Sequence, residues 1–240
     1  MIQGLYVTSQ GMIPRMTQMD NVSNNLANAA TNGFKKSNVF LRELITAQGA
    51  LDRAMGVERN AVPEEVWVDY MQGDFDETGR TFDVALNGSG FFRMRDADGT
   101  VMYTRDGRLQ QDPFGFLVNE KGMYLLDERN MPIQVNGNNF IIAGNGDVSV
   151  DGEYTQTIGL AEFERADYQQ LMNNGAGLFT RPAAVNEVMA NPATQFRQGF
   201  VENSNVEPVQ AMVDMIELHR AFELSQRAIQ IQDGTLQRTV

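Results

Sequence analysis

The chain has 240 residues, with no cysteine and a single histidine, His219. The absence of cysteine excludes disulfide bonds, thiol nucleophiles and cysteine-ligated zinc. One histidine cannot build a metal site from several imidazoles, and it leaves one imidazole for general-base catalysis. Several common kinds of enzyme chemistry therefore lack the residues they need.

Long apolar runs and an excess of positive charge are also missing. No uninterrupted apolar run approaches the ~20 residues that a membrane helix requires. The formal net charge of -12 argues against nucleic-acid binding, because phosphate requires a basic surface. The first charged residue is Arg15, so we expect no cleaved secretory signal. A cytoplasmic location is the default, and any export should leave the N-terminus uncut.

Apolar residues recur at intervals of seven near both ends of the chain. The first register contains Leu5, Met12, Met19 and Leu26, with Ile2, Ser9, Met16 and Ser23 in the companion register. Near the other end the register contains Met215, Phe222, Ile229 and Leu236, with Met212 and His219 in the companion register. This spacing predicts helices over 4–30 and 208–237 that pair through a heptad seam. Pro14 should kink the first helix locally.

The middle of the chain consists of short β-branched and aromatic runs separated by turn pairs. The pairs are Asn87-Gly88, Asp98-Gly99, Asp106-Gly107, Asn136-Gly137, Asn145-Gly146 and Asp151-Gly152. Such pairs accept the positive φ angles of tight hairpins. They predict an antiparallel β domain.

We therefore expect an α+β fold, with long N- and C-terminal helices paired as a coiled coil, extended linkers and a central antiparallel β domain. The expected boundaries are 1–36 and 205–240 for the terminal-helix domain, 37–79 and 196–204 for the extended linking segments, and 80–195 for the central β domain. Two helices that cover only each other leave much apolar surface for neighbours. The organisation therefore points to assembly.

Candidate catalytic and metal-binding residues are few. His219 lies on the heptad face, where a histidine is typical of a seam or an interface. The stretches around Asp96 and Asn145 resemble calcium loops faintly, but they lack the glutamate at position 12, and hairpin turns explain them. No pair among the 31 acidic residues is singled out for hydrolysis. We expect no enzyme activity, no metal and no cofactor.

Several blocks, in order along nearly the whole chain, carry a family resemblance. They are 21–36 (NVSNNLANAATNGFKK), 72–80 (QGDFDETGR), 82–92 (FDVALNGSGFF), 103–107 (YTRDG), 112–118 (DPFGFLV), 122–126 (GMYLL), 199–206 (GFVENSNV) and 212–222 (MVDMIELHRAF). As a set they closely resemble the signatures of the flagellar basal-body rod and hook family.

The resemblance implies a self-assembling structural subunit of a helical drive shaft that transmits torque and encloses the export channel. The terminal helices would form the inner layer and the β domain the outer layer. Implied partners are other rod proteins, copies of the chain itself and the flagellar type III export apparatus, with no nucleic acid and no membrane insertion. The implied location is the periplasmic rod of the basal body, reached without signal cleavage.

Within the family, a chain of this length with one modest β domain is more similar to rod than to hook proteins. The segment 49–66 does not match the distal-rod pattern, which favours the proximal rod. A distal-rod or hook-type subunit is the alternative. Two other classes stay open: a soluble β-domain binding module whose helices dimerise it and, less favoured, an acid-dependent hydrolase.

The small and amide-rich residues of the first block suit contacts between subunits, since alanine and glycine permit close approach and asparagine both donates and accepts hydrogen bonds. The expected assembly-interface residues are Leu5, Met12, Met19, Asn24, Asn25, Leu26, Asn28, Asn32, Gly33, Phe34, Asn203, Asn205, Met212, Met215, Phe222, Ile229 and Leu236.

Overall fold

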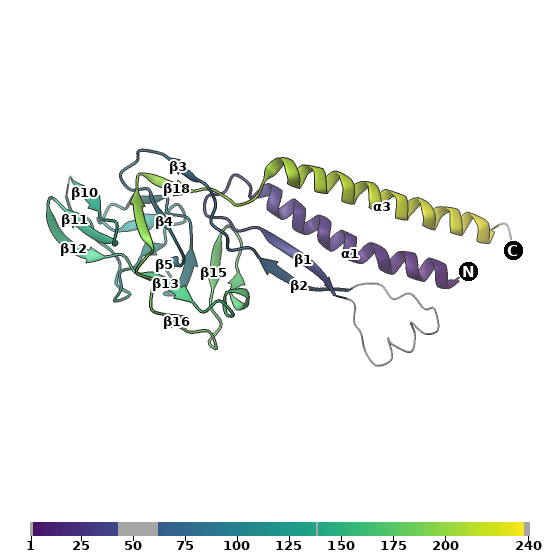
Figure 1. Ribbon diagram of the computed structural model, residues 1–240, viewed down its shortest axis with the longest axis horizontal. Coiled ribbons are helices and arrows are strands. Elements are labelled where there is room, and N and C mark those ends of the chain that lie inside the picture. The colour runs from purple at the N-terminus through teal and green to yellow at the C-terminus, as the bar shows by residue number, and fades with distance from the viewer. Residues whose placement is uncertain (1, 43–61, 138, 238–240) are drawn as a thin grey trace. The chain divides into compact units, whose positions relative to one another are not determined.

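The computed structural model describes residues 2–42, 62–137 and 139–237, which contain two α-helices and eighteen strands (Figure 1). The chain divides into two compact units. Unit 1 comprises Met1–Ala27, Lys36–Asp69 and Val206–Val240, and unit 2 comprises Asn28–Lys35 and Tyr70–Asn205. Within the described residues, no helix has the length and apolar character that crossing a membrane requires.

Unit 1 contains both α-helices and one two-stranded sheet. Its elements are α1 (Ile2–Ala27), β1 (Ser37–Arg42), β2 (Val62–Val68) and α3 (Pro208–Gln237). The antiparallel pairing of β1 with β2 shifts register between Phe40 and Leu41. The helix α3 begins at Pro208, where the missing N–H and fixed φ of proline do no harm. The guanidinium of Arg15 on α1 donates hydrogen bonds to Ala221 O at 2.8 Å and Ser225 Oγ at 2.6 Å on α3.

The predicted fold class, an α+β chain with terminal helices paired as a coiled coil, is wrong. Strands in antiparallel sheets make up most of the elements, and among the described side chains α1 and α3 do not form the predicted heptad seam. Met212 of the predicted seam is 51% exposed, and Met215 and Phe222 are only half-buried. An open pocket of about 550 Å³ is lined by residues of α1, α3 and β1. The polar contacts of Arg15 join the helices instead.

Unit 2 is built from short antiparallel strands. Its elements are β3 (Phe75–Glu77), β4 (Val84–Asn87), β5 (Phe91–Arg95), β6 (Val101–Thr104), β7 (Leu109–Gln111), β8 (Leu117–Asn119), β9 (Tyr124–Leu125), β10 (Phe140–Ile142), β11 (Asp147–Val150), β12 (Glu153–Thr157), β13 (Leu160–Phe163), a 3₁₀ helix (Tyr168–Gln170), β14 (Met172–Asn173), β15 (Leu178–Thr180), β16 (Glu187–Val188), β17 (Gln195–Gln198) and β18 (Phe200–Glu202).

The strands of unit 2 form one large sheet and three small ones. The large sheet follows the order β14-β15-β6-β5-β9-β8-β7, with β13 and β16 attached beside β5. The order β10-β11-β12 describes a three-stranded sheet, while β17 pairs with β4 and β18 with β3. The last two pairings bring the end of unit 2 back to its beginning.

Turn pairs close several of these hairpins, as the sequence predicts. Gly99 lies between β5 and β6, Gly146 between β10 and β11, and Gly152 between β11 and β12, all with positive φ. Gly107 does not adopt positive φ, and its role is close approach: a Cβ there would lie 1.6 Å from Val84 O. The pairs Asn-Gly and Asp-Gly thus serve two different purposes in this unit.

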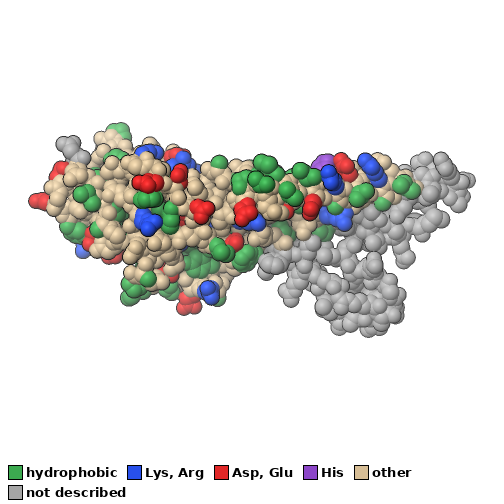
Figure 2. Space-filling view, turned by 45° about the horizontal axis from the view of Figure 1, so that its top comes forward, with side chains coloured by type: hydrophobic (Ala, Val, Ile, Leu, Met, Phe, Trp, Pro, Cys, Tyr) green, Lys and Arg blue, Asp and Glu red, His purple; other side chains and the backbone are tan. Residues whose placement is uncertain are grey.

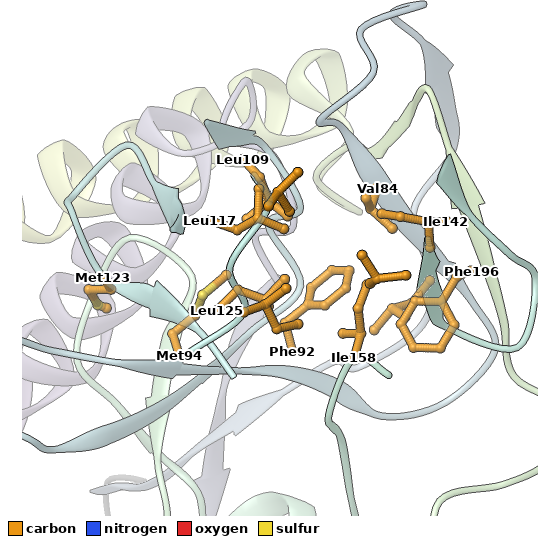
Figure 3. Packing of buried hydrophobic residues seen from close by; sticks show 14 of the residues in the cluster. Val84, Phe92, Met94, Leu109, Leu117, Met123, Leu125, Ile142, Ile158 and Phe196 are labelled. Carbon is orange, nitrogen blue, oxygen red and sulfur yellow. The ribbon is translucent and has the colours of Figure 1, made fainter. Parts of the chain in front are cut away.

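The main hydrophobic core lies in unit 2 (Figure 3). Phe92 and Met94 of β5 point into it together with Leu117 and Leu125, and Phe196 of β17 covers one side. The alternating inward positions of β5 explain how one short strand supplies several core side chains. Unit 2 therefore has what an independently folded domain needs.

Candidate assembly interface

The side-chain amide of Asn25 joins α1 to β1 within unit 1. This residue of α1 is only 2% exposed. Its Nδ2 donates to Ser37 O at 2.6 Å, and its Oδ1 accepts from Ser37 N at 2.9 Å. The amide therefore pairs with the first residue of β1 as a neighbouring strand would. Asn21, one turn earlier, donates to Ser37 Oγ at 2.8 Å.

The next part of the first sequence block, Asn28–Lys35, belongs to unit 2. A turn closes where Thr31 N donates to Asn28 O at 3.0 Å, and Gly33 N then donates to Glu202 O at 2.7 Å. Gly33 has a φ of 67°, and a Cβ on it would lie 2.4 Å from the backbone carbon of Arg105. Glycine is required here because the chain turns left-handed against another backbone.

Three buried charges hold this segment in place. Lys35 Nζ lies 2.5 Å from Glu202 Oε1, and Arg105 Nη1 lies 3.2 Å from Glu202 Oε2. The side chains of Lys35, Arg105 and Glu202 are 1%, 5% and 0% exposed. Lys35 Nζ also donates to Met71 O at 2.7 Å, and Gly73 N donates to Glu202 Oε1 at 3.1 Å. One carboxylate thus neutralises two cations that solvent hardly reaches.

The charge cluster of Lys35, Arg105 and Glu202 was not among the residues predicted from the sequence. Each member nevertheless belongs to a different family-like block, namely 21–36, 103–107 and 199–206. The available signal was a basic residue in each of the first two blocks and an acidic residue in the third. Because the three side chains are enclosed, the cluster is suited to holding structure and not to contacting a substrate.

Most of the exposed large hydrophobic residues among the described side chains of unit 1 lie on α3. Large hydrophobic side chains stand open to solvent at positions that share one side of the helix. They are Val209, Met212, Val213, Ile216, Leu224 and Ile231, which together we call the apolar face of α3. Figure 2 shows hydrophobic side chains interspersed with charged ones along this helical part of the surface. Several exposed large hydrophobic residues on one side of a helix are typical of a surface that another protein covers.

The structure distributes the predicted interface residues over both units. The buried ones are Asn25, Gly33 and Phe34, and the exposed ones are Asn24 and Met212. The half-buried ones are Met12, Met19, Leu26, Asn28, Asn32, Asn203, Asn205, Met215, Phe222 and Ile229. Asn205 N donates to Phe34 O at 3.4 Å, which brings these two together. The side chains of Leu5 and Leu236 lie outside the described part of the structure. The heptad count followed the registers of Met215 and Met212, and it therefore missed Val209, Val213, Ile216, Leu224 and Ile231.

Two family models match parts of the chain. Residues 197–240 match the model described as the C-terminal part of the flagellar basal body rod FlgEFG protein, and residues 85–150 match the model described as the flagellar hook protein FlgE/F/G D1 domain. The matches thus cover α3 and part of unit 2.

Full-length relatives agree with these matches. The chain is 32% identical to the flagellar basal-body rod protein FlgG of Buchnera aphidicola (Acyrthosiphon pisum), over 99% of this chain and 98% of the relative. It is 30% identical to FlgG of Bacillus subtilis, over 100% and 98%. It is 32% identical to the flagellar basal-body rod protein FlgF of Caulobacter vibrioides, over 93% and 90%.

Proposed function

The chain belongs to the flagellar basal-body rod protein family and is a structural subunit of the rod, not an enzyme; from this premise we propose that its two units have different tasks in the assembled shaft. Unit 1 contributes helices to an inner layer around the export channel, and unit 2 forms part of the outer layer. The apolar face of α3 is the observation that carries this proposal.

The apolar face of α3 lacks a cover among the described residues of its own unit, although burial of one Leu or Ile side chain is worth about 1.5–3 kcal/mol. Neighbouring axial subunits, including copies of this chain, supply that cover when they stack. The exposed apolar residues form one group from Val209 to Ile216 and a second one of Leu224 and Ile231, with exposed Arg220 and Arg227 on the same side of the helix, so one helix can contact more than one neighbour. Torque is then carried by many small contacts along the shaft.

The proximal rod is the proposed position of the subunit, with the distal rod or a hook-type position as the alternative. Relatives named FlgF and FlgG are about equally identical to the chain, so identity does not separate the positions. The preference depends on the sequence of 49–66, most of which lies outside the described residues. We place the rod in the periplasm and propose export by the flagellar type III apparatus without signal cleavage.

The test is a double substitution, Ile216→Lys with Leu224→Lys, in a flagellated host whose own copy of the gene is deleted. Both side chains are exposed, so the isolated variant should keep the circular dichroism and unfolding temperature of the wild type. Two buried ammonium groups should prevent incorporation into purified basal bodies and abolish swimming. Met189→Lys, at an exposed apolar residue of unit 2, is the matched control and should leave swimming intact.

Electron cryo-microscopy of basal bodies with the wild-type subunit then locates the chain. The proposal expects α3 in the inner layer with its apolar face against a neighbouring subunit. Normal swimming of the double variant, or a basal body in which that face points to solvent, would contradict it.

A further inference from the structure

We propose that unit 2 has a second docking surface, a groove beside β12 that binds an extended segment of a basic partner protein. The groove has a volume of about 1060 Å³ and is lined by residues of unit 2 alone. It is separate from the apolar face of α3 and does not depend on the task proposed for that helix. We call it the β12 groove.

The β12 groove has two walls that are already fixed to each other. One wall is β12, and the other is the stretch 129–134 together with Phe116. Gln156 of β12 bridges them, because its Oε1 accepts from Gln134 N at 3.2 Å and its Nε2 donates to Asp127 Oδ2 at 3.3 Å. The ring of Phe116 packs edge to face with the ring of Tyr124, and the two centroids are 5.7 Å apart. A preformed groove loses little entropy when a ligand enters.

Apolar side chains stand open along both walls. Met131 is 57% exposed and Tyr154 is 65% exposed, and Phe116, Pro132 and Val150 line the groove between them. Aromatic and methionine side chains in a concave site are typical anchors for a partner's apolar residue. The groove therefore has a place for at least one such residue.

The backbone of β12 favours an extended ligand. This strand is at one edge of the sheet β10-β11-β12, visible at the left of Figure 1, and pairs with β11 as its strand partner. At its far end, Thr157 O accepts from Glu128 N at 3.3 Å. Among the described residues, the outer edge of Glu153–Thr155 is left for a partner. The register shift between Val148 and Ser149 limits added strand pairing to a short stretch, so side-chain contacts must supply the specificity.

Charge identifies the class of partner. Among the acidic lining residues, Asp127 is buried, and its carboxylate already accepts hydrogen bonds from Arg129 N, Met131 N and Gln156 Nε2. The exposed carboxylates of the groove are Asp151 and Glu153, and the exposed cation is Arg129. This excess of negative charge attracts a lysine or arginine next to the apolar anchor. The net charge of the chain is -12, which attracts a basic protein more strongly than an acidic one, so the proposal commits to a basic partner and makes a second copy an outcome of the test.

The test selects nonapeptides from a random display library on the full-length chain, with counter-selection on the double variant Met131→Glu, Tyr154→Ala. The proposal expects enriched peptides that combine a Lys or Arg with an apolar residue. Their Kd, measured by fluorescence anisotropy, should rise at least tenfold for Tyr154→Ala and for Glu153→Lys. Ile141→Ala, at an exposed residue of β10 outside the groove, is the matched control and should leave Kd unchanged.

Three outcomes would overturn the proposal. One is a selection without peptides whose binding depends on Tyr154 or Glu153, and another is enrichment of acidic peptides. The third concerns a second copy, tested by sedimentation of the full-length chain. If Tyr154→Ala and Glu153→Lys alter its self-association while Ile141→Ala does not, the occupant is another copy of the chain and not a basic partner.

Discussion

Unit 2 has a large buried hydrophobic core, whereas the described side chains of unit 1 include few buried hydrophobic residues. The core around Phe92 and Leu125 belongs to unit 2. Among the described side chains of unit 1, the buried hydrophobic residues are Val68, Val206 and Ala211. The apolar face of α3 stays open in the same unit. Unit 2 thus has a core of its own, and we propose that neighbouring subunits complete the burial of unit 1.

The largest expected effect is a difference in amide exchange between the units. In the isolated chain the slowest amides of β5 should exchange only through global unfolding, which requires about 5–15 kcal/mol, while α3 opens locally at far smaller cost. Hydrogen exchange followed by mass spectrometry of the full chain measures both. The comparison breaks if α3 is protected as well as β5 in the monomer. It sharpens if α3 gains protection in purified basal bodies while β5 does not change.

The second largest effect concerns the buried charge cluster of unit 2. Glu202→Gln leaves Lys35 and Arg105 buried without a counter-charge, which should destabilise unit 2 by about 3–5 kcal/mol. Urea denaturation, followed by circular dichroism, measures the loss of unfolding free energy. Hydrogen exchange of the β5 amides measures the same loss independently. The matched control is Glu120→Gln, whose partner Arg108 and whose own side chain are partly exposed, and it should change stability by less than about 1 kcal/mol. Equal effects of the two substitutions would mean that the cluster does not hold unit 2.

The hairpins of unit 2 could be predicted from the sequence, but the side chains through which α1 contacts α3 could not. Asp-Gly at 98–99 and 151–152 specifies its turn locally, so neighbouring residues alone carry the information. In α3, apolar residues occur both at Met215 and Phe222 and on the open face at Ile216. A heptad count selects one register and cannot tell a side that faces α1 from one that awaits another subunit.

The charge cluster was missed for a different physical reason. Lys35 and Glu202 are 167 positions apart, and their meeting depends on β18 pairing with β3 at the closing end of unit 2. Periodicity carries no information on such a contact. Asn25 was predicted as an interface residue from its amide chemistry, and the structure shows that this amide already has its partner in Ser37. Whether the other predicted residues contact neighbouring subunits stays a prediction.

A smaller effect is expected at Gly33, where the segment Asn28–Lys35 passes close to the backbone of Arg105 within unit 2. Gly33→Ala places a Cβ against the backbone of Arg105 and Asp106, and it adds the cost of the left-handed conformation, about 1–2 kcal/mol. Gly122→Ala is the matched control, because Gly122 also has positive φ but a Cβ there would meet nothing within 4 Å. Thermal unfolding of both variants separates close approach from backbone strain. The close approach is unimportant if the two variants lose the same stability.

The smallest expected effect is the pH dependence at Asp106. Burial raises the pKa of its carboxyl above the ordinary value of 3.8, and Arg108, whose N–H donates to Oδ1 at 3.1 Å, opposes the rise only in part. A raised folded-state pKa means that folded unit 2 binds more protons than the unfolded chain, so this residue lowers stability as pH increases from 3.8 through the raised pKa. Asp106→Asn keeps the acceptor oxygen and removes the buried charge. Its unfolding temperature should therefore rise relative to the wild type between pH 3 and pH 7, and a relative fall would show that Arg108 outweighs burial in this unit.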